Sequence, residues 1–257
     1  MADRSLAWLV LAMAAVGSCM SMAVDQAPGP WRHAHATFYG DIKGGETTAG
    51  ACAYEDVFAK GYGLHTTALS TALFQDGATC GACYELMCYN STWCLPGAGT
   101  IKVTATNFCP PNWSIPSDAG GWCNPPRRHF DLSMPMFLRI AQYRGGIVPV
   151  AYRRIPCIRH GGIKFEMGGN NDWTSVLVYN VAGNGEVSAV GVRTTGSQEF
   201  TPLKRNWGQL WNWPDYSGHV GQGMSIRVTT SDGMVVYSHN VVPANWQLGQ
   251  TFEGNQF

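Results

Sequence analysis

The distribution of cysteines constrains this 257-residue chain more than any other feature. One of the nine cysteines, Cys19, lies in an N-terminal apolar segment, and the other eight lie between residues 52 and 157. An even number of cysteines in an oxidising compartment indicates disulfide bonds. Cys80-Gly81-Ala82-Cys83 has the CxxC spacing of a zinc or redox site, but no second CxxC or paired Cys/His set accompanies it. We therefore predict four disulfides, no metal and no cofactor.

The N-terminus has the features of a secretory signal peptide. Arg4 precedes an apolar run at residues 6–16, and Ser21 and Ala23 form an A-x-A-like cleavage site. We predict that residues 1–23 are removed and that the protein is secreted. No later stretch approaches the ~20 apolar residues of a transmembrane helix, so we expect no integral membrane contact.

The composition favours β structure and an uncharged partner. The 17 Lys+Arg balance the 17 Asp+Glu, and charged residues make up 13% of the chain, so long-range attraction favours neither nucleic acid nor an anionic membrane. Gly (31), Trp (10) and Tyr (10) are abundant, which suits turn-rich β structure and aromatic contact surfaces. We expect an all-β monomer that does not bind nucleic acid.

A domain boundary is expected where the cysteines end. About a hundred residues follow Cys157, a length that suits a separate domain. We predict a first domain at residues 24–158 and a second at 162–257, joined near Arg159-His160-Gly161-Gly162. Runs of β-branched and aromatic residues predict strands at 36–39, 83–89, 101–108 and 148–155 in the first domain, where one helix capped by Ser133 is expected before Gly145-Gly146.

The second domain has the pattern of a β-sandwich. Met224, Ile226 and Val228 alternate with polar residues, and Asp232-Gly233 suits a tight hairpin turn. The predicted strands lie at residues 163–167, 176–181, 187–193, 224–230 and 235–241.

Eight short motifs follow one another in a characteristic order along the chain. They are Ala36-Thr37-Phe38-Tyr39-Gly40, Thr104-Ala105-Thr106-Asn107-Phe108-Cys109, Gly120-Gly121-Trp122-Cys123, His129-Phe130-Asp131-Leu132, Ala141-Gln142-Tyr143-Arg144, Tyr152-Arg153-Arg154-Ile155-Pro156-Cys157, Arg205-Asn206-Trp207-Gly208-Gln209 and Gly249-Gln250-Thr251-Phe252-Glu253-Gly254. With these motifs the chain resembles a plant α-expansin over nearly its whole length after the signal peptide.

The resemblance implies a fold and an activity. The first domain would be a double-psi β-barrel similar to glycoside hydrolase family 45, and the second an immunoglobulin-like β-sandwich that binds carbohydrate. Such a protein would act in the plant cell wall, where it would loosen and extend walls at acidic pH without hydrolysis, by disrupting noncovalent contacts between cellulose and matrix glucans such as xyloglucan. The implied disulfides are Cys52–Cys80, Cys83–Cys157 and Cys88–Cys94, which leaves Cys109 and Cys123 to pair.

The resemblance also implies a site around one carboxylate. Asp131 matches the acid position of the hydrolases, and Thr37 and Tyr39 match the polar pair that contacts the sugar. His129 and Asn107 are expected to bind substrate as well, although a side-chain amide cannot act as a general base. Asp131 could alternatively interact with the start of the helix predicted near Ser133.

A second carboxylate would change the chemistry, because an inverting glycosidase needs both an acid and a base. Asp41-Ile42-Lys43 replaces part of the usual expansin loop, and Thr37-x-Tyr39-x-Asp41 has the spacing by which family 45 hydrolases place their base. An endo-β-glucanase with Asp131 as acid and Asp41 as base is therefore an alternative, as is a binding-only wall protein. Asp41 could equally be a turn residue.

Aromatic residues in the second domain predict a sugar-binding face, because aromatic rings stack on the CH faces of sugars. Trp173 and Trp207 match the cellulose platform of the family. Trp211 and Trp213 alternate and would share one face of a strand, although large aromatics are often core residues. The predicted platform is Trp173, Trp207, Trp211, Trp213 and Tyr216.

Two further features concern the surface. Asn90 and Asn112 begin N-glycosylation sequons. Arg127-Arg128 and Arg153-Arg154 are predicted to border the groove or to contact acidic wall polymers.

Overall fold

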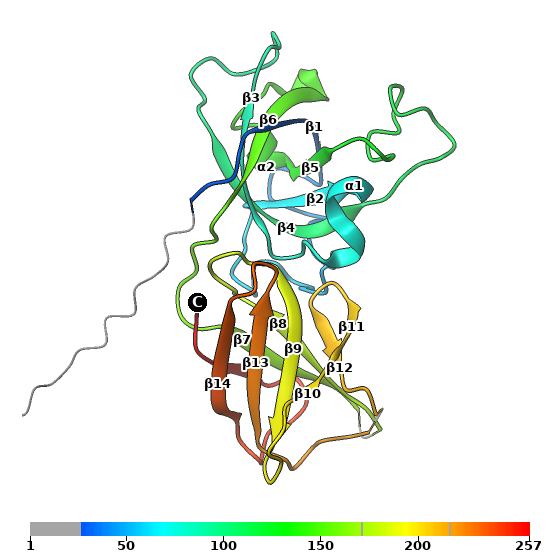
Figure 1. The fold of residues 1–257 in the computed structure, drawn as a ribbon. Coiled ribbons are helices and arrows are strands. Elements are labelled where there is room, and N and C mark those ends of the chain that lie inside the picture. Colours follow the sequence, from blue (N-terminus) through cyan, green and yellow to red (C-terminus); the bar gives the residue numbers. More distant parts are fainter. Residues whose placement is uncertain (1–26, 171, 216) are drawn as a thin grey trace, which may run out of the picture.

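The chain folds into two β domains stacked end to end (Figure 1). The computed structural model describes residues 27–170, 172–215 and 217–257. The predicted signal peptide and Tyr216 lie outside these residues. Within the described ranges, no helix is long and apolar enough to cross a membrane.

The first domain is a closed barrel of six strands. The strands lie in the order β1-β5-β2-β4-β3-β6, and the pairs β1–β5 and β2–β4 are parallel. Their bounds are β1 (Arg32–Tyr39), β2 (Thr66–Ser70), β3 (Cys83–Cys88), β4 (Ile101–Cys109), β5 (His129–Ser133) and β6 (Val148–Ile155). Apolar side chains such as Leu69, Phe130 and Val150 are completely buried in this domain.

The helical segments of the first domain are all short. They are α1 (Thr71–Phe74), η1 (Gln75–Gly77), α2 (Met134–Phe137) and η2 (Tyr143–Gly145). The prediction of a longer helix capped by Ser133 is wrong, since the Ser133 hydroxyl donates to the Leu64 carbonyl (2.5 Å) and makes no capping bond. Met136, Phe137 and Ile140 are nevertheless buried in the hydrophobic cluster of the barrel, so their apolar spacing reflects packing against this core.

The second domain consists of two packed sheets. One has the order β10-β9-β13-β14 and the other β11-β12-β8-β7-β15. Antiparallel pairing of β13 with β14 confirms the hairpin predicted around Asp232-Gly233, and the all-β prediction is confirmed for both domains. The bounds are β7 (Lys164–Gly169), β8 (Thr174–Tyr179), β9 (Val187–Thr194), β10 (Thr201–Pro202), β11 (Lys204–Trp207), β12 (Leu210–Asn212), β13 (Met224–Thr230), β14 (Val235–Val242) and β15 (Thr251–Glu253).

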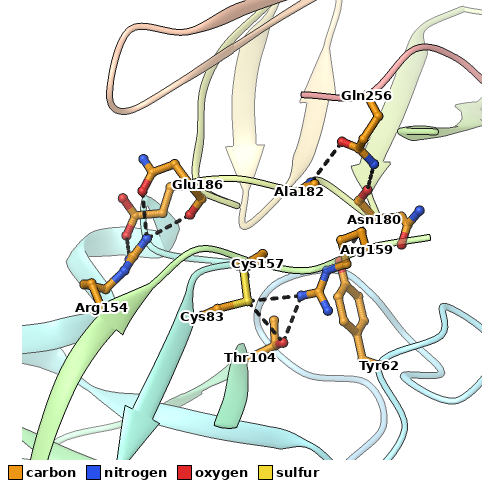
Figure 2. The surroundings of a disulfide bond; sticks show 12 residues. Tyr62, Cys83, Thr104, Arg154, Cys157, Arg159, Asn180, Ala182, Glu186 and Gln256 are labelled. Atoms are coloured by element: carbon orange, nitrogen blue, oxygen red, sulfur yellow. Dashed lines mark hydrogen bonds and ion pairs between the residues drawn. A yellow bond between two sulfur atoms is a disulfide. The ribbon is translucent and has the colours of Figure 1, made fainter. Parts of the chain in front are cut away.

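The barrel and the sandwich meet around a disulfide between Cys83 and Cys157 (Figure 2). On one side of it, Arg154 donates to the Asn184 carbonyl (2.8 Å) and pairs with Glu186. On the other side, Arg159 donates to the Thr104 hydroxyl (2.8 Å). The Arg154 contacts join the last barrel strand to the sandwich, and the Arg159 contact holds the segment between the domains against β4. The division into residues 24–158 and 162–257 stays a prediction, with which the end of β6 and the start of β7 agree.

Apolar packing strengthens the contact between the domains. Leu177 and Tyr179 of β8 are buried in the hydrophobic cluster of the barrel. All four disulfides have the pairing that the resemblance implied, which confirms that prediction: Cys52–Cys80, Cys83–Cys157, Cys88–Cys94 and Cys109–Cys123.

Candidate functional site

Three polar side chains form a hydrogen-bonded chain where β1 and β5 run side by side. The parallel register places Thr37 opposite Asp131. The Thr37 hydroxyl donates to Asp131 Oδ1 (2.6 Å) and lies 2.7 Å from His129 Nε2. A threonine hydroxyl has one proton, so a bond donated to Asp131 requires Nε2 of His129 to donate to Thr37. The direction of the chain is therefore from His129 through Thr37 to Asp131.

Burial sets the protonation states of the two ends of this chain. It raises the pKa of Asp131 to about 6, against the opposing effect of the Thr37 hydrogen bond. It lowers the pKa of His129 to about 3, with smaller contributions in the same direction from His35 and Arg127. His129 is therefore neutral, and Asp131 titrates in the mildly acidic range.

Asp131 and Thr37 open onto a groove of about 480 Å³. Asp131 is the one carboxylate among the described residues that line it. The Cys109–Cys123 disulfide closes one wall, where Trp122 lies with the Arg127 guanidinium 5.6 Å from its ring centroid. Trp122 was not among the predicted site residues. Its position between a glycine pair and a disulfide cysteine was the signal that could have identified it.

Tyr39 and Asn107 lie close to the hydrogen-bonded side chains of Thr37 and Asp131 but do not line the groove. Burial raises the pKa of Tyr39 to about 12, with the Asn107 amide lowering it and the charge of Asp131 raising it further. The Tyr39 hydroxyl has no partner of normal hydrogen-bond geometry among the described residues. Asn107 Oδ1 accepts the backbone N–H groups of Ala51 (2.9 Å) and Phe108 (2.8 Å).

His129 does not contact substrate, so that prediction is wrong. Its side chain is completely buried, because β5 enters the barrel core at His129 and Phe130. His129 is instead a positioning residue that orients the hydroxyl of Thr37 towards Asp131.

Replacing His129 with alanine is expected to move the pH dependence of activity to higher pH. The Thr37 hydroxyl would lose the donor that directs its proton, and the bond that lowers the pKa of Asp131 would weaken. The measurement is activity against pH for His129→Ala and His129→Gln. The glutamine variant retains an N–H donor and should shift less. Identical profiles for both variants and the unmodified protein would contradict this positioning role.

Asp41 is engaged in a turn. Its Oδ1 accepts the backbone N–H groups of Lys43 (2.8 Å) and Gly45 (2.9 Å), and these backbone hydrogen bonds lower the pKa of its fully exposed carboxyl. Asp41 is absent from the described residues that line the groove. These contacts favour the turn interpretation over the catalytic base.

Trp173 and Trp207 lie together in a cleft between the domains. The Trp207 side chain is 57% exposed, and both tryptophans line a cleft of about 710 Å³ with Gly50 and Phe74 from the barrel. A Cβ on Gly50 would lie 3.0 Å from Asn107 Cγ, so the cleft begins beside the polar residues of the barrel.

Trp211 and Trp213 do not belong to the binding face, and that prediction is wrong. Each is 3% exposed and packs in the sandwich core. Their alternation does place them on one face of the strand segment, but this is the inner face. The Arg205 guanidinium lies 4.3 Å from the Trp211 ring centroid.

The two sequons have different surroundings. Asn90 is exposed in a loop with a positive φ of 51°. Asn112 is exposed and lines the groove, so a glycan there would restrict access to Asp131. Glycosylation of either residue stays a prediction.

A barrel with a carboxylate in its groove, joined to a sandwich that exposes tryptophan, places the chain in a class of two-domain β proteins. Comparison with known families and proteins narrows this class. Residues 163–243 match the family model described as "Expansin C-terminal domain", and residues 66–152 match that described as "Lytic transglycolase". The latter is a double-psi β-barrel model, which confirms the predicted fold of the first domain.

Whole-chain similarity leads to the same family. Expansin-A25 of Arabidopsis thaliana is 57% identical over 225 residues, which cover 87% of this chain and 79% of that protein. Expansin-A13 of Oryza sativa subsp. japonica is 48% identical, with 89% and 87% covered. The chain belongs to the expansin family.

A solved structure shares the fold at low sequence identity. Expansin from Clavibacter michiganensis is 20% identical, with a TM-score of 0.65 and coverage of 88% of this chain and 97% of that one. A mutant of the same bacterial protein, solved in complex with cellohexaose, has a TM-score of 0.64 at 19% identity.

Proposed function

We propose that this protein loosens plant cell walls at acidic pH by binding a glucan strand in the barrel groove and weakening its noncovalent contacts with neighbouring chains. The observation that carries this proposal is the partly buried Thr37–Asp131 hydrogen bond at a groove in which Asp131 is the one carboxylate among the described lining residues. Because burial raises the pKa of Asp131 to about 6, its carboxyl becomes protonated in a mildly acidic wall. A protonated carboxyl can donate to a sugar hydroxyl, whereas a carboxylate only accepts.

The residues at the groove and at the interdomain cleft have separate tasks in this mechanism. Asp131 and Thr37 contact the strand in the groove. The Tyr39 hydroxyl is buried beside Asn107 and Asp131 and contributes to the polar surroundings of the groove. Trp173 and Trp207 stack against sugar rings in the interdomain cleft. Because the contacts of Arg154 with Glu186 and Asn184 join the two domains, one glucan assembly can engage both surfaces.

The proposed partners are cellulose and matrix glucans such as xyloglucan, and the proposed location is the plant cell wall after secretion. The cellohexaose complex of the bacterial expansin mutant supports a β-glucan ligand. Similarity to expansins of Arabidopsis thaliana and Oryza sativa supports a wall protein.

The competing hypothesis is hydrolysis with Asp41 as the base. Asp41→Ala is expected to leave wall extension unchanged, because its carboxylate bonds to its own loop and not to the groove. The experiment is constant-load extension of heat-inactivated plant wall strips in acidic buffer, with reducing ends assayed in the same samples. Extension without new reducing ends supports the proposal. Release of reducing sugar that disappears in Asp41→Ala would overturn it in favour of the endo-β-glucanase.

A further inference from the structure

The outer face of the four-stranded sheet carries an aromatic and cationic cluster that the proposed function does not use. We name it the outer-sheet cluster. Inward-facing Val192, Ile226 and Val228 are buried, and the alternation of side chains along a strand directs their neighbours to the outside. The cluster consists of Arg193 in β9, Phe200 before β10, Arg227 in β13, and Tyr237 and His239 in β14.

The rings and guanidinium groups of this cluster are in mutual contact. Arg193 Cζ lies 5.1 Å and Arg227 Cζ 5.4 Å from the centroid of the Phe200 ring. The Tyr237 ring meets Phe200 edge-on at 5.7 Å and lies nearly parallel to the His239 ring at 6.0 Å. Two cations therefore share one aromatic ring as their platform.

A glycine in β9 makes room for this arrangement. The strand register places Gly191 on one side of Arg227 and Tyr237 on the other. A Cβ on Gly191 would lie 3.2 Å from Arg227 Nη2 and 3.5 Å from Phe200 Cβ. The Arg227 side chain thus lies over Gly191 of β9, and a side chain at position 191 would crowd it.

The two arginines of the cluster differ from the arginines that form salt bridges with carboxylates. Arg127, Arg153 and Arg154 each form a salt bridge with a carboxylate. Across the described ranges, Arg193 and Arg227 form none, and neither does Glu199 beside Phe200. A guanidinium that stacks on a ring keeps its N–H edge available, and that edge matches a carboxylate in plane.

We propose that the outer-sheet cluster is a second polysaccharide site, for a chain of carboxylated sugars. Arg193 and Arg227 would bind the carboxylates, and the Tyr237 ring, which is 43% exposed, would stack against a sugar face. Trp207 belongs to the other sheet of the sandwich. One molecule could therefore hold a neutral glucan and an acidic wall polymer at the same time. This site does not depend on the groove around Asp131.

The test is the affinity of the full-length secreted protein for polygalacturonate, measured by calorimetry at constant ionic strength. Arg193→Gln/Arg227→Gln is expected to weaken binding about tenfold or more, because two charge-assisted contacts are lost. Arg193→Lys/Arg227→Lys retains the charge but not the planar fork, and should weaken binding by nearly as much. Tyr237→Ala should weaken it about threefold to tenfold.

Matched controls separate this site from general charge effects. Arg139→Gln/Arg144→Gln removes two exposed arginines of the barrel and should leave the affinity unchanged, as should Trp207→Ala. Equal losses in the barrel double variant would overturn the proposal, since net charge would then explain binding. Binding of fully methyl-esterified polygalacturonate or dextran sulfate as tightly as polygalacturonate would overturn it as well. Unchanged melting temperatures of the Arg193 and Arg227 variants show that they are folded.

Discussion

Replacing Asp131 with asparagine is expected to abolish acid-dependent wall extension and to stabilise the folded protein at neutral pH. The activity is lost because asparagine cannot titrate, although it can still accept the Thr37 hydrogen bond. The effect on stability follows from the raised pKa. In the folded protein the carboxyl has a pKa of about 6, whereas an unfolded aspartate has one of about 3.9.

The sign of the stability effect follows from proton binding. Between about pH 4 and pH 6 the folded state retains a proton that the unfolded state has lost, so stability decreases as pH rises. Below about pH 4 the protonated Asp131 carboxyl makes its full contribution to the free energy of unfolding. Above pH 6 this contribution is lost, which lowers the free energy of unfolding by roughly 2–3 kcal/mol. Asp131→Asn should remove this dependence and raise the free energy of unfolding at pH 7 by that order.

Denaturant unfolding at pH 4 and pH 7, together with wall extension across the same range, measures both effects. Asp56→Asn is the matched control, since Asp56 is exposed and its Oδ1 accepts backbone N–H groups as an asparagine oxygen can. It should alter neither property. Extension by Asp131→Asn with an unchanged pH profile would contradict a role for protonation of this carboxyl.

The strands that the sequence predicts best are those with one buried face. β13 has the predicted bounds, because Met224, Ile226 and Val228 face the core and alternate with more polar residues. β2 was missed because all its residues are buried. Its sequence Thr-Thr-Ala-Leu-Ser therefore has no alternation and few strongly apolar residues. A strand enclosed on both faces cannot be recognised by period two.

For the candidate site, the sequence predicted which carboxylate is present but not how its neighbours are arranged. The His129-Phe130-Asp131 tripeptide identified the carboxylate of the groove, but not that His129 is buried and orients Thr37 from inside the barrel. That relation depends on parallel pairing of β1 with β5, which joins residues about ninety positions apart. Local sequence carries no information on such a register.

Trp207 and Trp211 illustrate the same limit, and they supply the second large prediction. Both are tryptophans of one short hairpin, paired through β11 and β12, yet one is 57% exposed and the other 3%. Trp207→Ala is expected to weaken cellulose binding about tenfold by removing a stacking ring, with little change in stability. Trp211→Ala should instead lower the free energy of unfolding by about 3–5 kcal/mol, because it empties a core position.

Cellulose pull-down and denaturant unfolding of the two variants measure these effects. Binding by Trp211→Ala is to be measured where the variant remains folded, and it should then match that of the unmodified protein. If Trp207→Ala bound cellulose normally, the exposed tryptophan would not be part of the platform, and Trp173 with the barrel residues of the cleft would have to account for binding. If Trp211→Ala reduced binding without loss of stability, the buried position of Trp211 would be contradicted, since a side chain enclosed in the core can affect binding only through the fold that it supports.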